Sequence, residues 1–215
     1  MGASRIPGER HSQAAARERI VLAASDLFFR KGIRATGVDT LIERAGVAKA
    51  TFYRHFRSKD ELIVAWLRSS NARWLDVVTA ELDTDLNPPL RALVEFWDRL
   101  GDWAEREHYL GCPYLKALVE IDEPSHPARL EVAAFVHDVD GYFARLTAAA
   151  GFQQSEEIAI RLRLLAMGAL MAILLDPSRA PIDRARESTI ALLASWRGIT
   201  RSEMEGLIEG RASES

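Results

Sequence analysis

Apolar residues recur at helical spacing along the whole chain, and no stretch shows a sustained alternation of apolar and polar positions. This pattern predicts an all-α protein of about nine to ten helices. The first helix is expected from about Gln13 to Lys31, with Ile20, Leu27 and Phe28 on its apolar face. Gly32, directly after the last periodic residue, is expected to end it.

Two short helices and a long one are expected next. Val38–Ala45 places apolar residues at i, i+3, i+4 and i+7, and Gly46 interrupts the pattern. A second short helix is expected over Lys49–His55. Ser58 has the character of an N-cap for a long helix that reaches about Leu82.

The rest of the chain is also predicted to be helical, with prolines, glycines and acidic residues marking the boundaries. The expected ranges are 87–107, 113–121, 127–150, 155–175 and 181–197. Thr200 with Glu203 matches a capping box for a short helix near the C-terminus. No internal repeat is evident in the sequence.

Charge is distributed unevenly. The 215 residues have a formal net charge of −3, but residues 1–60 carry 12 Lys and Arg against 6 Asp and Glu, and residues 61–215 carry 16 against 25. A basic head on an acidic body is typical of a DNA-binding module joined to a second domain, although a merely solvated basic face gives the same balance. We therefore expect a disordered basic arm at 1–12, a DNA-binding domain at 13–60, a larger helical domain at 61–200 and a tail at 201–215.

The segment from Thr36 to Leu62 carries the candidate chemistry. Gly46 suits a tight turn between two short helices because glycine readily adopts a positive φ. Phe52 and Phe56 continue the apolar face inward, so the other residues of the second short helix point outward. Arg can donate two hydrogen bonds to guanine, Ala and Thr can contact the thymine methyl group, and Lys, Tyr and His can reach phosphates. The pattern predicts a helix-turn-helix that presents Lys49, Ala50, Thr51, Tyr53, Arg54 and His55 to the major groove.

This segment resembles the DNA-binding motif of the TetR family of transcriptional regulators, and the likeness covers about residues 13–62. The residues that match in register are Thr36, Val38, Leu41, Ala45, Gly46, Val47, Thr51, Phe52, Tyr53, His55, Phe56, Lys59 and Leu62. The resemblance implies that Thr36 and Lys59 bind the phosphate backbone. It also implies that bases are faced by Lys49, Ala50, Thr51 and Arg54, and that phosphates are clamped by Tyr53 and His55. Taken singly, Tyr53 could pack, His55 could cap local backbone and Arg54 could be solvated.

Two departures from the family pattern concern helix caps. Gly37 stands where Ser or Thr often caps the first short helix, and Ala48 replaces the Ser that often caps the second. A glycine cap costs only a few tenths of a kcal/mol, whereas losing a serine cap costs about 1 kcal/mol. The resulting hypothesis is that the recognition helix is marginally stable alone and becomes fully ordered on DNA.

Residues 166–175 are apolar all round a helix, so they must be buried on more than one side. In TetR relatives the last two long helices of each subunit form a four-helix dimer bundle, and the resemblance implies a homodimer here. The alternative is that the segment is only the core of a monomer. Twofold symmetry would require a palindromic operator. The expected interface comprises Leu165, Gly168, Ala169, Ala172, Ile190, Leu193 and Trp196.

Aromatic residues and methionines gather where an effector pocket would lie, although residues of this kind at helical spacing also build an ordinary core. The hypothesis is a repressor that a small apolar or aromatic effector releases from its operator. One alternative is a DNA-binding regulator that is controlled by a partner protein and has no effector; another is an all-α enzyme or carrier with a vestigial helix-turn-helix. The candidate effector residues are Trp66, Phe96, Trp97, Tyr114, Phe135, Tyr142, Met167 and Met171.

Motifs for catalysis, cofactor binding or metal binding are absent from the sequence, and no cofactor or metal is expected. The longest uncharged apolar run, Leu164–Leu175, has 12 residues, too few to span a bilayer. With a polar N-terminus, this predicts a cytoplasmic protein. The single cysteine, Cys112, excludes an intramolecular disulfide; beside Pro113 at a helix start it is either an oxidant-sensing thiol or a buried structural one.

Overall fold

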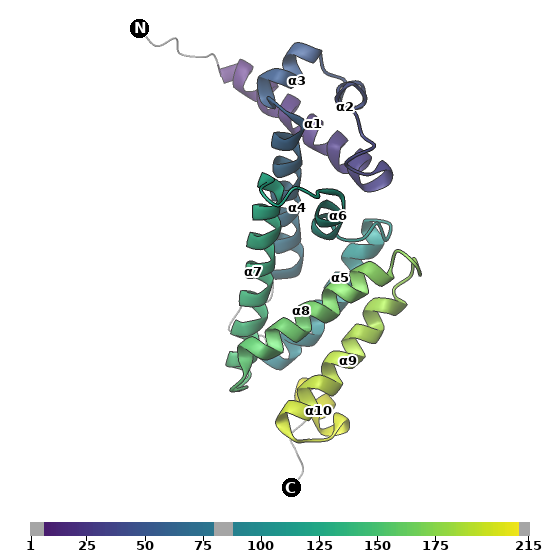
Figure 1. Cartoon of the computed structure of the whole chain (residues 1–215). Coiled ribbons are helices and arrows are strands. Elements are labelled where there is room, and N and C mark those ends of the chain that lie inside the picture. The colour runs from purple at the N-terminus through teal and green to yellow at the C-terminus, as the bar shows by residue number, and fades with distance from the viewer. Residues whose placement is uncertain (1–6, 80–87, 211–215) are drawn as a thin grey trace. The chain divides into compact units, whose positions relative to one another are not determined.

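The computed structural model describes residues 7–79 and 88–210, with side chains from 14 to 72 and from 88 to 210. This described part is helical, without strands (Figure 1). Its helices are α1 (Pro7–Lys31), α2 (Val38–Ala45), α3 (Lys49–His55), α4 (Lys59–Thr79), α5 (Pro89–Arg106), α6 (Pro113–Glu120), α7 (Pro127–Ala149), α8 (Ser155–Ala172), α9 (Ala180–Arg197) and α10 (Arg201–Ile208). The all-α prediction is confirmed.

Most helix boundaries agree with the sequence pattern, and α1 is the main exception. It begins at Pro7 rather than near Gln13, so that residues 7–12 are helical where a disordered arm was expected. Proline is well suited to the first position of a helix, and the alanines at 14–16 have the highest helix propensity. The predicted start was based on the apolar residues at helical spacing. The local preferences extend the helix on the N-terminal side of those residues. Residues 1–6 of that arm lie outside the described residues.

Capping interactions fix several helix ends, and the sequence predicts two of them. The Ser58 hydroxyl accepts a hydrogen bond from the Glu61 backbone N–H at 3.1 Å and starts α4. Thr200 and Glu203 form the expected capping box of α10. Gly198, with φ +68°, ends α9 in the left-handed conformation that glycine adopts without strain.

The chain divides into two compact units. The first contains the chain up to Asn71 together with Lys116–Val132, and the second contains Ala72–Leu115 and residues 133–215. In the first unit, Trp66 of α4 is fully buried, and its ring packs edge-on against Phe28 and Phe29 of α1, with centroids 5.2 and 5.6 Å away. This aromatic contact anchors α4 to α1.

Ion pairs and hydrogen bonds tie the distant segment Lys116–Val132 into the first unit. Glu120 accepts a hydrogen bond from the Arg34 backbone N–H at 2.9 Å, and its carbonyl accepts another from Arg34 Nε at 2.7 Å. Arg68 pairs with Glu131 at 2.6 Å. The compact unit that holds α2 and α3 therefore extends beyond residue 60 and includes residues remote in sequence.

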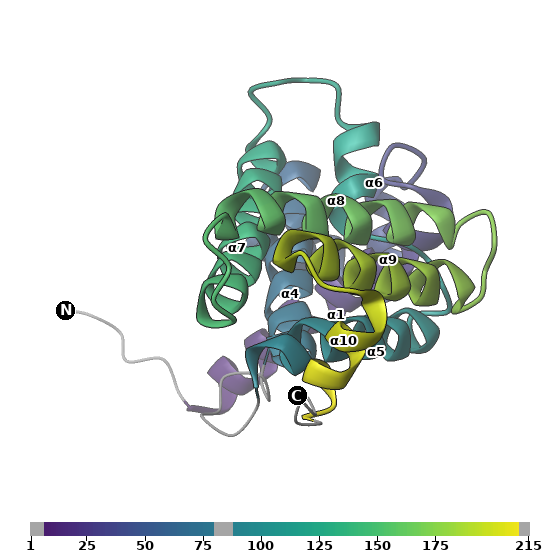
Figure 2. The ribbon, with the colours of Figure 1, turned by 90° about the horizontal axis from the view of Figure 1, so that it is seen from below.

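The second unit is built around α5, α8 and α9. α9 lies beside both α5 and α8 (Figure 1 and Figure 2). Phe96 and Trp97 are almost fully buried. The Phe143 ring packs edge-on against the Phe96 ring, with centroids 4.7 Å apart. Arg179 pairs with Asp102, and its guanidinium covers Gly101 so closely that a Cβ there would lie 2.7 Å from Arg179 Cζ. Any larger residue at position 101 would displace this ion pair.

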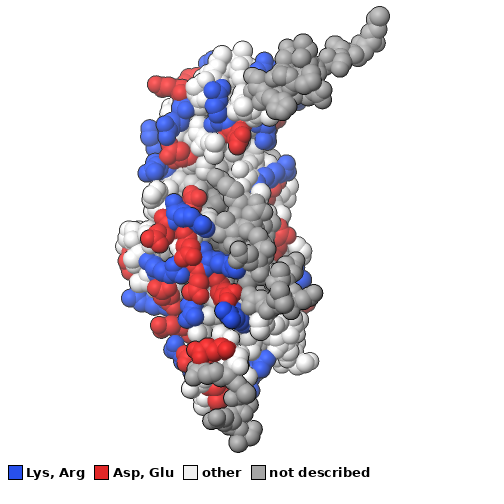
Figure 3. Space-filling view, turned by 180° about the vertical axis from the view of Figure 1, so that it is seen from behind, with Lys and Arg blue, Asp and Glu red and all other residues white. Residues whose placement is uncertain are grey.

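Charges are interspersed on the face seen in Figure 3, where Lys and Arg alternate with Asp and Glu. Among the described residues, several ion pairs join residues of the same helix, such as Arg91 with Glu95 and Arg161 with Glu157. Such exposed pairs contribute little to stability. Among the described residues, no helix combines the length and apolar character needed to cross a membrane.

Candidate nucleic-acid interface

The α2–α3 pair has the geometry of a helix-turn-helix. Gly46 takes φ +62° and ψ +42° after α2, and its N–H donates to the Glu43 carbonyl at 3.1 Å. Leu41 of α2 and Phe52 of α3 are fully buried, and Phe56 is nearly so. The two helices are therefore locked to the body of the unit by their apolar faces, which fixes the opposite face of α3 toward solvent.

The exposed face of α3 carries most of the predicted DNA-binding residues. Lys49, Ala50, Tyr53 and Arg54 are exposed, and Thr51 is half-buried. Tyr53 is 45% exposed, and its ring packs edge-on against the buried Phe52 ring with centroids 5.4 Å apart, which limits its orientations. α3 thus presents cationic, aromatic and small side chains together, as a helix that reads a major groove requires.

Thr36 is not on this exposed face. Its side chain is buried, and its hydroxyl donates to the Gly32 carbonyl at 2.7 Å. The expectation that this side chain binds a phosphate therefore conflicts with the geometry. The hydroxyl satisfies a backbone carbonyl at the end of α1 and so holds the turn that leads into α2.

His55 and Lys59 are both half-buried. Burial, with the nearby charges of Arg54 and Arg17, lowers the pKa of His55, so the imidazole is uncharged at neutral pH. Its Nε2 is buried without a hydrogen-bond partner among the described residues. Burial also lowers the pKa of Lys59, although Glu120 and Asp60 act in the opposite direction. Their roles as phosphate contacts remain predictions.

One acidic residue on this surface was not singled out by the sequence pattern. Asp39, in the first turn of α2, has a side chain that is 86% exposed, and its carboxylate lies 3.2 Å from Lys49 Nζ. This ion pair joins residues of two different helices, so the i,i+3 and i,i+4 spacing that predicts ion pairs within one helix does not predict it. Arg57, two residues after the end of α3, is also exposed and adds a cation that the motif leaves unassigned.

Neither short helix has a side-chain N-cap. Gly37 and Ala48 occupy the cap positions, and neither contributes a side-chain hydrogen bond. Replacing Ala48 by Ser should stabilise α3 by about 1 kcal/mol, because the hydroxyl can accept a free backbone N–H of the first turn. We expect slower amide exchange across Lys49–His55 in Ala48→Ser than in the wild type. Full protection of this segment in the free wild-type protein would contradict the expected marginal stability.

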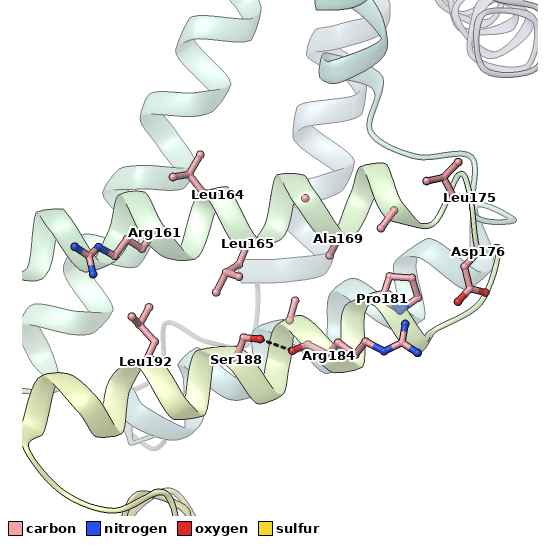
Figure 4. A pocket seen from close by; sticks show the side chains of 13 residues that line it. Arg161, Leu164, Leu165, Ala169, Leu175, Asp176, Pro181, Arg184, Ser188 and Leu192 are labelled. Carbon is pink, nitrogen blue, oxygen red and sulfur yellow. Dashed lines mark hydrogen bonds between the residues drawn. The ribbon is translucent and has the colours of Figure 1, made fainter.

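A second candidate surface lies in the other unit, along α8 and α9. A groove of about 810 Å³ runs between exposed positions of these helices (Figure 4). Its floor contains Leu165, Gly168, Ala169 and Ala172, four of the residues predicted for a dimer interface. Leu164 and Leu175 stand at its edges and are 57% and 90% exposed. α8 therefore buries one apolar face in its own unit and leaves another uncovered.

The predicted residues of α9 lie elsewhere. Ile190 and Leu193 are buried in the core of the second unit, and Trp196 is half-buried beneath the guanidinium of Arg161. The assignment of Ile190 and Leu193 to an intersubunit surface is thus contradicted by their burial. Ile190 and Leu193 pack inside their own unit, and the α9 residues that line the groove include Arg184, Ser188 and Leu192.

The predicted effector residues do not form one group. Trp66 belongs to the core of the first unit, whereas Phe96, Trp97 and Tyr142 are buried together in the second. Tyr114 and Phe135 stack in parallel, with centroids 3.9 Å apart. Met167 is half-buried and Met171 is 43% exposed. None of these residues lines the groove between α8 and α9.

Two polar atoms in the buried aromatic group have no hydrogen-bond partner among the described residues. They are Tyr142 Oη and Trp97 Nε1. Burial raises the pKa of Tyr142 above its ordinary value, which keeps its hydroxyl protonated. A buried donor without a partner is costly, so each of these groups favours a ligand or ordered water that accepts a hydrogen bond.

Cys112 is buried at the start of α6. Desolvation raises the pKa of its thiol to about 11, despite backbone N–H groups of Leu115 and Tyr114 that favour the thiolate. Because the thiolate is the reactive form, the thiol is unreactive at neutral pH. Of the two alternatives left by the sequence, this geometry favours the structural thiol.

Native protein at pH 7.5 should therefore resist alkylation at Cys112, and the rate should rise as the pH approaches about 11. Iodoacetamide labelling followed by mass spectrometry measures this, with urea-unfolded protein as the fully reactive control. Rapid labelling of the native protein at neutral pH would restore an oxidant-sensing role.

Comparisons with known proteins agree with this architecture. The family model "Bacterial regulatory proteins, tetR family" matches residues 20–66, and the model "Tetracyclin repressor-like, C-terminal domain" matches residues 88–189. The HTH-type transcriptional activator FasR of Mycolicibacterium smegmatis is 31% identical over 203 residues, covering 90% of this chain and 87% of FasR. The HTH-type transcriptional repressor NemR of Escherichia coli is 26% identical over 121 residues, covering 56% of this chain and 61% of NemR.

Solved structures share the fold. A TetR transcriptional regulator from Chloroflexus aurantiacus has a TM-score of 0.74 at 23% identity, covering 86% of this chain and 96% of its own. A TetR-family regulator from Streptomyces coelicolor has a TM-score of 0.70 at 24% identity, covering 94% and 98%. These relatives and neighbours are transcription factors, which argues against the alternative of an all-α enzyme or carrier.

Proposed function

This chain belongs to the TetR family of DNA-binding transcriptional regulators, and from that premise we propose that it binds a palindromic operator as a homodimer and represses transcription until a small effector releases it. The observation that carries the DNA-binding part is the exposed face of α3. Lys49, Tyr53 and Arg54 project from a helix whose other face is fixed by buried Phe52.

The groove along α8 and α9 supports the homodimer. Leu164 and Leu175 are exposed apolar side chains on its rim, and Gly168 on its floor presents no side chain at all. Two copies of α8 can therefore approach closely, with the leucines of one copy covering the small residues of the other. Burial of such apolar area is the main driving force of association.

A twofold dimer determines what the operator must look like. Two recognition helices related by a twofold axis bind two half-sites in inverted orientation, with centres about 34–36 Å apart or a multiple of this distance. Selection from a randomised duplex DNA library should therefore enrich an inverted repeat. A single unrepeated site bound by one protomer would contradict the proposal.

The effector part rests on the buried aromatic group of the second unit. Phe96, Trp97 and Tyr142 offer apolar contacts, and two unpaired donors, the Tyr142 hydroxyl and the Trp97 indole N–H, lie among them. This chemistry suits an apolar or aromatic molecule that carries a hydrogen-bond acceptor such as a carbonyl or carboxylate oxygen. The substitution Tyr142→Phe removes the hydroxyl donor and keeps the aromatic ring.

A screen of aromatic and aliphatic carboxylates and ketones against the protein–operator complex tests the effector. Compounds that weaken operator binding should do so less in Tyr142→Phe than in the wild type. If no compound weakens binding, regulation by a partner protein, the alternative without an effector, is favoured instead.

Activation is the second candidate for the direction of regulation, because FasR, whose match covers 90% of this chain, is named an activator. NemR, which matches a shorter part, is named a repressor. In vitro transcription from a promoter that carries the selected operator separates the two. Added protein should lower transcript levels if it represses and raise them if it activates.

A further inference from the structure

A carboxylate lies on the surface that we assign to DNA, although DNA itself is negatively charged. Asp39 stands in the first turn of α2 with its side chain 86% exposed. Lys49, the first residue of α3, places its ammonium 3.2 Å from Asp39 Oδ1 and is itself 66% exposed. The pair therefore joins the N-terminal ends of the two helices of the helix-turn-helix, and both of its side chains are exposed.

The position of Lys49 determines where the carboxylate would lie on DNA. N-terminal residues of a recognition helix contact base edges in the major groove. If the Lys49 ammonium reaches a base edge, the Asp39 carboxylate, 3.2 Å from that ammonium, lies close to the same base pair. Lys49 is the only hydrogen-bonding partner that the described residues give to Asp39, so most of its acceptor capacity is free.

The chemistry of the pair selects a particular base edge. A carboxylate accepts hydrogen bonds but cannot donate them, and it is repelled by phosphates, so it needs the amino group of cytosine or adenine. The ammonium beside it has several N–H donors and needs acceptors. In the major groove, a G·C pair presents two adjacent guanine acceptors, N7 and O6, next to the cytosine N4 amino group.

An A·T pair matches less well. In the major groove, the adenine N6 amino group lies between the acceptors adenine N7 and thymine O4, and the thymine methyl group lies beyond O4. A charged ammonium gains nothing from contact with this methyl group. The two side chains therefore match the major-groove edge of a G·C base pair. The Lys49 ammonium donates to guanine, and the Asp39 carboxylate accepts from cytosine.

We propose that Asp39 and Lys49 together read one G·C base pair in each half-site, with Asp39 accepting a hydrogen bond from cytosine N4 and holding Lys49 toward guanine. Asp39 is a specificity-determining residue rather than a source of affinity. The inference rests on the proposed placement of α3 in the major groove, and it assigns a base-reading role to α2 that the family motif leaves open at this position.

Asp39→Ala tests the proposal against duplex DNA. The wild type is first used to select its inverted repeat from a randomised duplex library, and each base pair of one half-site is then varied in labelled oligonucleotides. We expect the wild type to prefer G·C at one position about tenfold, and Asp39→Ala to lose this preference while the other positions stay unchanged. Asp39→Asn, whose amide both donates and accepts, should bind A·T at that position nearly as well as G·C.

Glu43→Ala is the matched control, because Glu43 is exposed on the same helix and its removal changes the net charge equally. It should retain the G·C preference. Asp39 also favours the N-terminal end of α2 electrostatically, so the melting temperatures of all variants are compared. If Asp39→Ala and Asp39→Asn keep the same sequence preference, or change the affinity for every sequence equally, the proposal is overturned. If the wild type binds no duplex at all, the proposed function itself fails, which is a distinct result.

Discussion

Gly168→Glu should convert the protein from a dimer to a monomer and lower its affinity for a palindromic operator by at least about 100-fold. Gly168 lies on the floor of the groove between α8 and α9, and a Cβ built there meets no atom within 4 Å. The protomer therefore tolerates the new side chain, and losing a glycine even favours the helix. In a twofold dimer the two carboxylates would be desolvated and repel each other.

Sedimentation and a gel-shift titration at equal protomer concentration measure the two effects. Ala148→Glu is the matched control, since Ala148 is an exposed residue of α7 outside the groove and gains the same charge. It should remain dimeric and bind normally. A Gly168→Glu protein that stays dimeric and binds its operator with wild-type affinity would show that the groove serves another purpose.

Replacing Tyr53 and Arg54 together by Ala should reduce operator affinity by at least about 100-fold. Both side chains are exposed on α3, and the core beside them consists of buried Phe52 and Phe56, of which Phe52 also contacts the Tyr53 ring. A twofold dimer loses each contact twice. The helical content should be unchanged, because alanine has the highest helix propensity.

Fluorescence anisotropy with the selected operator gives the affinity, and circular dichroism gives the helical content. Arg106→Ala, which removes an exposed arginine near the end of α5, controls for the loss of positive charge. It should bind like the wild type. Equal affinities of the double variant and the wild type would move the DNA-binding surface away from α3.

Local sequence information was sufficient for most helix boundaries, with the start of α1 as the main exception. The bounds of α2 and α3 agree with the predicted ranges, because Gly46 can take the left-handed conformation and apolar residues recur at helical spacing on both sides. Ser58 and the Thr200–Glu203 pair could be assigned as caps for the same reason. Each of these signals acts over one or two turns.

Side-chain environments were harder to infer, because they depend on which other elements of the fold pack against each side chain. Thr36 matched a family motif, yet its hydroxyl is used by a carbonyl at the end of α1. Ile190 and Leu193 are apolar residues of a terminal helix, and nothing in their spacing tells an intersubunit surface from a core. The pairing of Asp39 with Lys49 joins two helices across a turn and has no linear signature.

The sequence by itself determined that the described residues form helices and no strands, and, apart from the start of α1, where most of the helices begin and end. It also predicted that α3 carries the side chains that read a major groove. These properties follow from periodicity, capping and turn chemistry, which are local. Only the tertiary structure decided which of those side chains are free. It buried Thr36, lowered the pKa of His55, left the groove on α8 uncovered and set Asp39 beside Lys49. Burial and ion pairing depend on distances between residues remote in sequence, and only the fold sets those distances.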